Sequence, residues 1–171
     1  SLLLASSVTG QTIWEENFED ETTSSATSSF AGNNWSATST GSGTMSILNG
    51  PDGLGFEFDN TPNTTHTCTW TSEAIDITGY TVSSGANASS VTYAVSGSSG
   101  SPTFSHNVAI TGNSATITIT IVMPNKKSRI IDSIKLSGTC TPSTWYADDD
   151  GDGLGDSSST TSACSQPAGY V

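Results

Sequence analysis

The sequence predicts an all-β fold, a jelly-roll β-sandwich followed by a C-terminal extension that is rich in loops. Three observations predict it. Apolar and polar residues alternate with a period of two along many short segments, as expected of strands with one buried face. Groups of Gly, Ser, Asn and Pro separate these segments, as turns separate the strands of a sandwich. Helical periodicity is nearly absent.

The clearest strand spans 115–121, where isoleucines and threonines alternate. One face of this strand should be buried and the other should contact water. Turn residues at 49–53, 99–102 and 112–113 separate further segments of the same kind. In chain order, the predicted strands are 12–18, 43–49, 54–58, 66–71, 73–77, 90–95, 103–110, 115–121 and 129–137.

Composition divides the chain into three parts. Residues 1–11 are first apolar and then small, like the end of a secretory signal peptide, so we expect a signal-peptide remnant or an N-terminal extension. The strands place the sandwich at 12–139. The alternation then stops, and 140–171 forms a separate extension. We expect the chain to be a fragment of a longer protein with further domains.

The charge balance disfavours two classes of partner. The chain has 16 acidic and 4 basic residues, which gives a formal net charge of −12. Nucleic-acid binding requires a basic surface, and the chain lacks one. An anionic membrane surface is disfavoured for the same reason, and no segment after residue 11 is apolar enough to insert into a membrane. A surface rich in Ser, Thr, Gly and Asn is common in secreted and cell-surface proteins, and we expect this localisation.

A run of aspartates and glycines at 148–156 is the most specific motif. With Asp148 as position 1, oxygen donors fall at positions 1, 3, 5, 7 and 9, and Gly153 falls at position 6. This spacing suits Ca²⁺, which takes about six to eight oxygens, and the glycine permits the sharp turn. Position 12 is Ser159 instead of the Glu of a full EF-hand, so we expect modest affinity. The alternative is a solvated acidic linker. The expected ligands are Asp148, Asp150, Asp152, Leu154 (through its carbonyl) and Asp156.

The three cysteines are Cys68, Cys140 and Cys164. An odd number leaves at least one cysteine unpaired within the chain. A bridge between Cys140 and Cys164 would close the acidic loop, but the sequence alone leaves the pairing open.

The sequence contains no recognisable catalytic motif, and we expect a protein that is not an enzyme. The two histidines, His66 and His106, lie among Thr, Ser and Asn residues and are expected to face solvent from strands.

Four aromatic residues are candidates for contact with a glycan, because sugars stack their C–H faces on aromatic rings. They are Trp35, Trp70, Tyr80 and Tyr93. For each of them, a position in the core or at a sheet edge is the alternative. Trp145 and Tyr146 are expected to pack the acidic loop against the sandwich.

Two stretches resemble known families. Residues 145–156, together with 163–171, resemble the thrombospondin type 3-like calcium repeat, in the form found in secreted and surface proteins of Bacteroidetes. The resemblance implies the same five calcium ligands as the spacing of the aspartates.

The second resemblance is to the jelly-roll modules of carbohydrate-active enzymes, which precede catalytic domains in secreted Bacteroidetes proteins. It rests on residues 13–20, 34–35, 70–80 and 130–136. It implies that the first and last strands lie side by side. It also implies a second, structural calcium ion held by Glu19, Asp20 and Asp132. The alternative is that these three carboxylates cap a strand or face solvent.

Together, these observations predict a secreted, non-catalytic module with a calcium-stabilised linker, which binds a polysaccharide or other glycan or presents a neighbouring catalytic domain to one. The alternative is a surface adhesion or filament subunit. In that case residues 1–11 would act as a donor strand for other copies of the chain.

Overall fold

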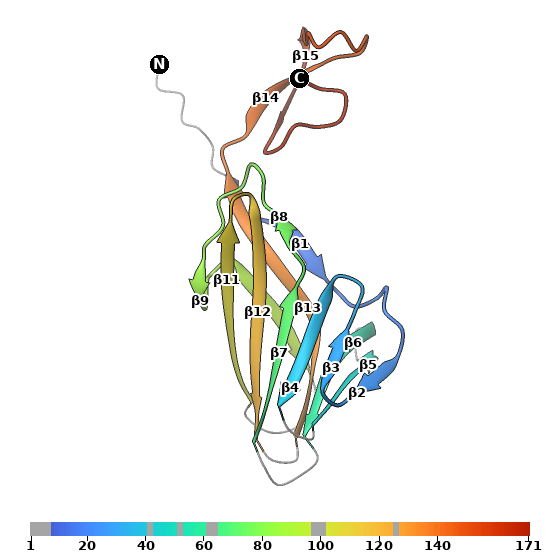
Figure 1. Cartoon of the computed structure of the whole chain (residues 1–171). Helices are drawn as coiled ribbons and strands as arrows, with labels where there is room; N and C mark the ends of the chain where they lie inside the picture. Colours follow the sequence, from blue (N-terminus) through green and yellow to red (C-terminus); the bar gives the residue numbers. More distant parts are fainter. Residues whose placement is uncertain (1–7, 41–42, 51–52, 61–64, 97–101, 125–126) are drawn as a thin grey trace.

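The computed structural model of the chain describes residues 8–40, 43–50, 53–60, 65–96, 102–124 and 127–171. These residues form fifteen strands and no helix, which confirms the predicted all-β fold (Figure 1). None of them belongs to a helix with the length and hydrophobicity that a membrane crossing requires.

The strands of the first half of the chain are β1 (Val8–Glu16), β2 (Ser24–Ala26), β3 (Ser29–Ala31), β4 (Trp35–Thr40), β5 (Thr44–Gly50), β6 (Gly53–Asn60), β7 (His66–Ser72), β8 (Ile75–Asp76) and β9 (Gly85–Ala86). Those of the second half are β10 (Val91–Ser96), β11 (Thr103–Thr111), β12 (Ser114–Met123), β13 (Lys127–Cys140), β14 (Ser143–Ala147) and β15 (Asp156–Ala163).

Two antiparallel sheets enclose one hydrophobic core. The first sheet has the order β1-β13-β6-β5-β2, and β10 also pairs with β13. The second has the order β3-β4-β7-β12-β11-β9, and β8 also pairs with β12. Buried apolar side chains come from both sheets, so the fold is a β-sandwich. The hairpin of β14 and β15 lies beyond one end of this sandwich (Figure 1).

Most predicted strands exist, and the alternation places their side chains as expected. On β12, Ile117, Ile119 and Ile121 are buried while the threonines between them remain accessible. The turn Gly112-Asn113 joins β11 to β12, and Gly112 has a φ of 59°, a conformation that glycine adopts without strain. The predicted strand at 73–77 shortens to β8, and most of the predicted turn at 99–102 lies outside the described residues.

The first and last strands of the sandwich pair with each other, as expected. β1 runs antiparallel to β13, with Val8 opposite Cys140 and Gln11 opposite Gly138. β1 therefore begins at Val8 rather than at the predicted residue 12. Residues 8–11 form part of this chain's own sheet, so of the proposed donor strand only 1–7 remain, which lie outside the described residues.

Candidate functional site

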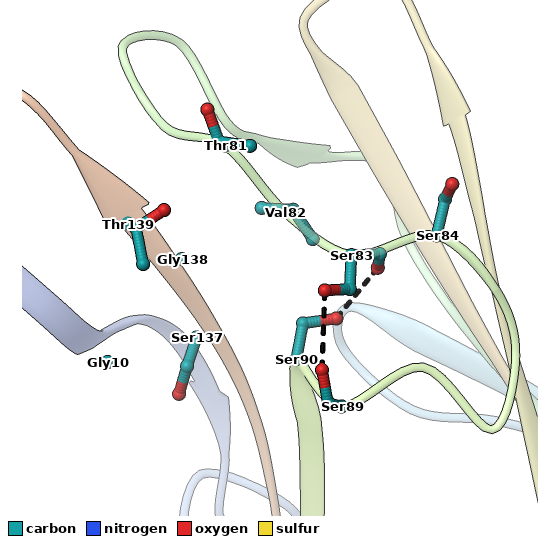
Figure 2. Close-up of a pocket in the computed structure, with 10 residues that line it drawn as sticks. All are labelled: Gly10, Thr81, Val82, Ser83, Ser84, Ser89, Ser90, Ser137, Gly138 and Thr139. Carbon is teal, nitrogen blue, oxygen red and sulfur yellow. Dashed lines mark hydrogen bonds between the residues drawn. The ribbon is translucent and has the colours of Figure 1, made fainter.

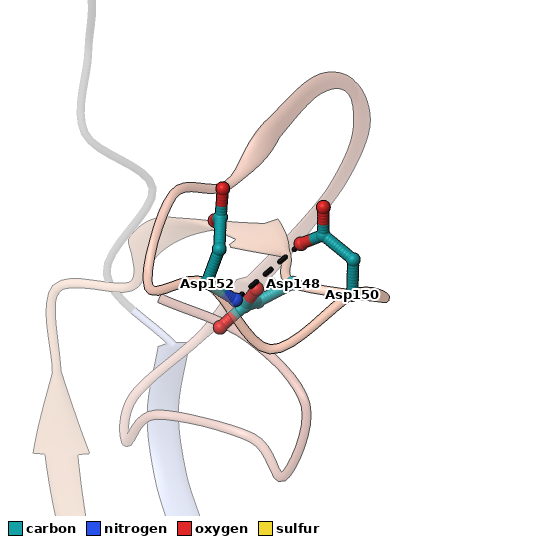
Figure 3. Close-up of side chains that lie close together, drawn as sticks. All are labelled: Asp148, Asp150 and Asp152. Atoms are coloured by element: carbon teal, nitrogen blue, oxygen red, sulfur yellow. Dashed lines mark hydrogen bonds between the residues drawn. The ribbon is translucent and has the colours of Figure 1, made fainter.

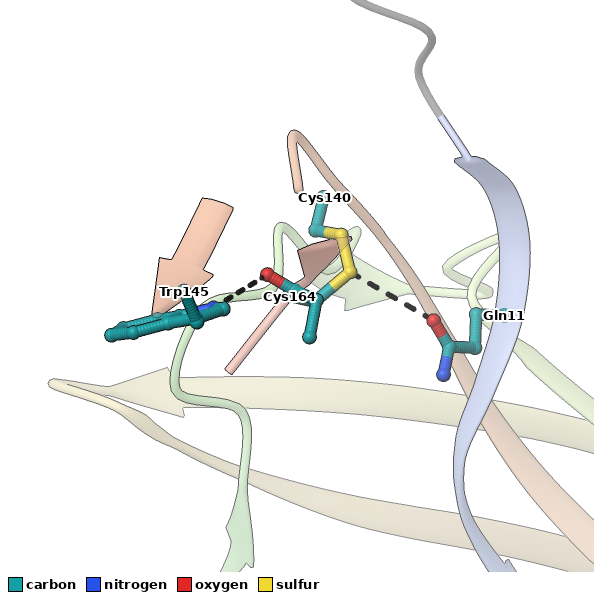
Figure 4. Close-up of a disulfide and its surroundings, with 5 residues drawn as sticks. Gln11, Cys140, Trp145 and Cys164 are labelled. Carbon is teal, nitrogen blue, oxygen red and sulfur yellow. Dashed lines mark hydrogen bonds between the residues drawn. A yellow bond between two sulfur atoms is a disulfide. The ribbon is translucent and has the colours of Figure 1, made fainter. Parts of the chain in front are cut away.

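A disulfide bond ties the extension to the sandwich. Cys140 ends β13 and Cys164 follows β15, so the bond closes the segment that contains the acidic loop (Figure 4). The pairing that the sequence left open is thus between these two cysteines. A second contact lies beside the bond, because the backbone of Gly79 packs closely against the carbonyl of Cys164. The extension is therefore fixed to the sandwich at two points.

Cys68 is the unpaired third cysteine. It is fully buried in β7, and burial raises the pKa of its thiol to about 12. Because the thiolate is the reactive form, this thiol is inert at neutral pH.

Backbone hydrogen bonds frame the acidic loop. Tyr146 and Val171 exchange two of them, of 3.0 and 2.8 Å, and the amide of Asp148 donates to the carbonyl of Gly169 over 2.9 Å. The indole of Trp145 donates to the carbonyl of the last residue of β15 over 3.0 Å (Figure 4). These contacts lie within the extension. The sequence predicted that Trp145 and Tyr146 pack the acidic loop against the sandwich. In the structure, the hydrogen bonds of these two residues hold the extension together instead.

Three carboxylates converge inside this frame. Asp148, Asp150 and Asp152 each place an oxygen within 4.8 Å of the others (Figure 3). The amide of Gly153 donates to Asp148 Oδ2 over 3.2 Å, and that of Leu154 donates to Asp152 Oδ1 over 2.7 Å. Within the described parts of the chain, this is the one group of His, Cys, Asp or Glu side chains that could hold a metal ion. Charges so close together repel, and a cation would relieve this repulsion.

One carboxylate oxygen of this cluster is buried without a hydrogen-bond partner. Asp148 Oδ1 is buried, and no described group donates a hydrogen bond to it. Leaving a carboxylate oxygen buried and unpaired costs free energy, which a cation in contact with it would recover. The chemistry of the residues present therefore fits a metal ion bound by oxygens.

Two glycines give the loop its shape. Gly151 has a φ of 74° and Gly153 has a φ of 83°. Residues with a side chain rarely adopt this conformation. The sharp turn expected at Gly153 is confirmed, and it aims the amides of the turn at the aspartates.

The last two predicted ligands lie at the rim of the cluster. Leu154 is 74% exposed and, like Asp150, Asp152 and Asp156, lines an open hollow of about 270 Å³. The backbone amide and the hydroxyl of Ser158 both donate hydrogen bonds to Asp156, and they lower the pKa of its carboxyl. Asp156 lies outside the group of three aspartates whose oxygens converge within 4.8 Å.

Two of the residues expected to hold a second calcium ion accept hydrogen bonds within the chain. Glu19 Oε1 accepts a hydrogen bond from the amide of Leu54 over 2.8 Å. Asp132 Oδ1 accepts one from Ser96 Oγ over 3.1 Å. Glu19, Asp20 and Asp132 are not among the described residues whose ligand atoms converge within 4.8 Å, and the second calcium site stays a prediction.

Sequence reasoning missed two carboxylates that hold the loop after β1. Glu16 is 6% exposed and accepts a hydrogen bond of 2.7 Å from the amide of Phe18, whose φ is 62°. Burial, and to a smaller extent the charges of Asp20 and Glu21, raise the pKa of Glu16. Glu21 Oε1 accepts a hydrogen bond of 2.9 Å from the indole of Trp35. The alternation along β1 was the available signal, because it places Glu16 on an inward-facing position.

Two of the four predicted glycan contacts are core residues. Trp70 is 0% and Trp35 is 5% exposed. Their ring centroids lie 6.1 Å apart in a stacked arrangement, and Phe30 stacks on Trp35 at 5.3 Å. Both indoles are on inward-facing positions of β4 and β7, so they cannot stack on a sugar. The prediction is wrong for these two residues.

The other two candidates are half-buried. Tyr80 lines a hollow between the sandwich and the extension, together with Cys164. Tyr93, on β10, contacts Phe104 and His106 on β11, with ring centroids 5.6 and 5.7 Å away. Burial raises the pKa of the Tyr93 hydroxyl. These rings keep part of their surface accessible to a ligand.

A further hollow, of about 460 Å³, lies beside β13 and has no signal in the sequence (Figure 2). Ser90 Oγ donates to the carbonyl of Ser83 over 2.8 Å, which fixes one wall. The lining is uncharged and offers hydroxyls and backbone groups to a neutral, polar ligand. Its residues are Gly10, Thr81, Val82, Ser83, Ser84, Ser89, Ser90, Ser137, Gly138 and Thr139.

The histidines lie deeper than the sequence predicted. His66 is 6% exposed on an inward-facing position of β7, and its Nδ1 lies 2.9 Å from the carbonyl of Thr40. His106 is half-buried, with Nε2 at 2.9 Å from the carbonyl of Ala88. Both rings contact backbone carbonyls, and the prediction that they face solvent is wrong.

No protein-family model matches the chain, and no curated protein or solved structure matches it.

Proposed function

We propose that residues 140–171 are a calcium-binding extension of a secreted, non-catalytic binding module. The observation that carries this proposal is the buried, unpaired Oδ1 of Asp148 beside two further carboxylates. A solvated acidic linker, the alternative, has no reason to bury a carboxylate oxygen without a partner.

Calcium is the ion that suits this donor set. Asp148, Asp150 and Asp152 supply hard carboxylate oxygens, and Leu154 and Asp156 are near enough to complete the coordination shell after a local rearrangement. Zinc in a structural site prefers thiolate and imidazole ligands. Cys164 cannot supply a thiolate, because it forms the disulfide with Cys140. Without the closing Glu of an EF-hand, the affinity should resemble that of extracellular modules, with a Kd of about 10⁻⁴–10⁻³ M.

The ion would stabilise the folded extension by mass action, because it binds the ordered loop better than the unfolded one. The disulfide already fixes one end of the extension on the sandwich. Calcium binding at the other end would make the whole segment rigid.

Limited proteolysis with chymotrypsin tests this proposal. Leu154 is the exposed cleavage site inside the loop. At a calcium concentration of ten times the Kd, cleavage after Leu154 should slow about tenfold relative to a chelator, because cleavage requires the open loop. Magnesium is the matched control, since it demands a smaller and more regular shell. Equal cleavage rates with calcium and with chelator would count against the proposal.

We propose a neutral glycan as the partner of the sandwich. Two features support it: the uncharged, hydroxyl-lined hollow beside β13 and the accessible part of the Tyr93 ring. Trp35 and Trp70 give no support, because their rings are buried. The alternative of assembly through a donor strand rests on residues 1–7 alone.

A panel of soluble polysaccharides tests the glycan proposal. Saturable binding to one class should weaken about two- to tenfold in Tyr93→Ala, since a stacked ring contributes about 0.5–1.5 kcal/mol beyond its buried area. Tyr146→Ala is the control, because Tyr146 is exposed and lies in the extension. Absence of binding across the panel would shift the proposal to surface adhesion or assembly.

A further inference from the structure

The outer side of the second sheet carries a regular array of hydroxyl groups, which we call the hydroxyl face. It consists of alternate residues on four neighbouring strands, whose other residues point into the core. Its members are Ser36, Thr38 and Thr40 on β4, Thr67, Thr69 and Thr71 on β7, Thr116, Thr118 and Thr120 on β12, and Thr103 and Ser105 on β11, where the neutral amide of Asn107 continues the row.

The members align in rows across the strands. Thr69 lies opposite Thr38 on one side and Thr120 on the other, and Thr120 lies opposite Ser105. These three ladders run without a register shift, whereas the ladders of β1 and β10 with β13 contain shifts. The hydroxyl face therefore repeats about every 4.8 Å across the strands and about every 6.8 Å along them.

The array is rigid and its hydroxyls are available. Threonine is β-branched and has few side-chain conformations, and the strands beneath rest on fully buried residues such as Trp70 and Ile119. Among the described residues, one hydroxyl of the face makes a hydrogen bond within the chain, from Thr40 Oγ1 to the carbonyl of Thr67 over 3.4 Å. A partner would bind a prearranged surface without a large loss of conformational entropy.

The hydroxyl face is also uncharged. No Asp, Glu, Lys or Arg occurs in β4, β7, β11 or β12, although the chain as a whole has a net charge of −12. Charge complementarity therefore selects a neutral partner, because an ionic one would find no counter-charge here.

We propose that the hydroxyl face binds ice. The surface of ice is neutral and presents ordered rows of water molecules whose repeats are of the same order as those of the array. Threonine hydroxyls can hydrogen-bond to these molecules, and the methyl groups between them fill the spaces of the lattice. A dissolved polysaccharide chain has no two-dimensional lattice, so it would not require aligned rows on several strands.

Strand twist sets the extent of the contact. Neighbouring strands rotate by about 20–25°, so a flat crystal meets the central strands best. β-Bulges would increase this twist, and the ladders of β4, β7 and β12 contain none. Thr69, in the middle of these three strands, is the residue whose replacement should matter most.

Partitioning into slowly growing ice tests the inference. The full chain is dissolved at low concentration, an ice hemisphere is grown in the solution, and the chain is quantified in ice and in liquid. The wild-type chain should be enriched in the ice relative to an unrelated globular protein. Thr69→Lys should lose this enrichment completely, because it places a long charged side chain at the centre of the face.

Thr144→Lys is the matched control, since it adds the same charge at an exposed strand position of the extension. It should partition like the wild type. Thr118→Lys is a second variant within the face, and far-UV circular dichroism checks that each variant is folded. Exclusion of the wild-type chain from ice, or equal enrichment of the folded Thr69→Lys and Thr118→Lys variants, would overturn the inference. Capture by an insoluble neutral polysaccharide without enrichment in ice would overturn it too, and would assign the face to glycans.

Discussion

Asp148 and Asp149 are neighbours in the sequence, but their surroundings differ. Asp148 is half-buried, belongs to the cluster of three aspartates and has an unpaired oxygen. Asp149 is exposed and lies outside the cluster. Asp149 nevertheless lines the open hollow beside Asp150 and Asp152, so it adds negative charge near the cluster without belonging to it. Replacing Asp148 or Asp149 therefore distinguishes binding at a specific site from the general attraction of a cation to negative charge.

Glu16 gives a pH-dependent prediction at the same scale. Its folded-state pKa is raised above the ordinary value of 4.5 by burial, so the folded chain binds this proton more tightly than the unfolded chain. Stability must then fall as the pH rises through the window from 4.5 to the folded-state pKa. Glu16→Gln keeps an oxygen that can accept the hydrogen bond from Phe18 and removes the buried charge.

We therefore expect Glu16→Gln to be more stable than the wild type at pH 7, with the difference vanishing below pH 4.5. Urea unfolding in chelator at several pH values measures it. If the variant were less stable than the wild type at pH 7, the charge of the Glu16 carboxylate would stabilise the fold. That result would contradict the account that burial of this charge destabilises it.

At the residue scale, the spacing of the aspartates predicted which side chains converge, whereas the alternation of apolar and polar residues did not tell core aromatics from exposed ones. The intervals between Asp148, Asp150 and Asp152 predicted that they converge, because a loop with turn glycines turns every second residue inward. Alternation placed Trp70 on the face opposite Thr69 and Thr71, and Trp35 opposite Ser36, but it could not tell which face was the core. An aromatic face suits both a core and a glycan platform, and the stacking of the two rings decides between them.

The disulfide sets the prediction at the scale of elements. Cys140 and Cys164 are 24 residues apart, and a bridge over such a segment contributes about 3 kcal/mol in the chain-entropy description. In the double variant Cys140→Ser, Cys164→Ser, the hairpin of β14 and β15 should exchange its amide hydrogens about a hundredfold faster, while β12 keeps its protection. Hydrogen-exchange mass spectrometry measures both.

Cys68→Ala is the control for this experiment. It removes a buried thiol from the core and should weaken the sandwich without loosening the hairpin. If the hairpin kept its protection in the double serine variant, the extension would be stable by itself and the bond would not be its anchor.

Among the elements, long alternating strands were predictable and short ones were not. β12 stands out in the sequence because isoleucine recurs at every second position, and β11 because Phe104, Val108 and Ile110 fall on alternate positions of one face. β2, β3 and β9 contain two or three residues each, too few for a periodic signal. β15 reads as a low-complexity Ser/Thr run because it is mostly exposed on both faces, and only its pairing with β14 makes it a strand.

The whole molecule consists of a sandwich stabilised by its core and an extension stabilised by other means. Buried aromatic and aliphatic side chains from both sheets hold the sandwich, and this predicts that it unfolds independently of calcium. The extension contributes little to that core, so its order depends on the disulfide, the hairpin and the proposed ion. At a calcium concentration of ten times the Kd, binding would add about 1.4 kcal/mol to its stability.

The sequence predicted the fold class and the loop at this scale, but not the outer faces of the sheets. The aligned rows of hydroxyls arise from the register between β4, β7, β12 and β11, which are distant in the sequence. No local pattern contains that register, since it is set when the two sheets close over one core.

The measurement that tests the central claim most directly is a calorimetric titration of calcium into the metal-free full chain and into Asp148→Asn and Asp149→Asn. The account predicts one saturable site in the wild type, with a Kd of about 10⁻⁴–10⁻³ M. Asp148→Asn should weaken binding at least about tenfold, because it changes the carboxylate with the unpaired oxygen. Asp149→Asn should stay within about twofold of the wild type, since screening reduces the effect of an exposed charge outside the cluster. No saturable binding by the wild type, or equal losses in both variants, would contradict a specific calcium site in this loop.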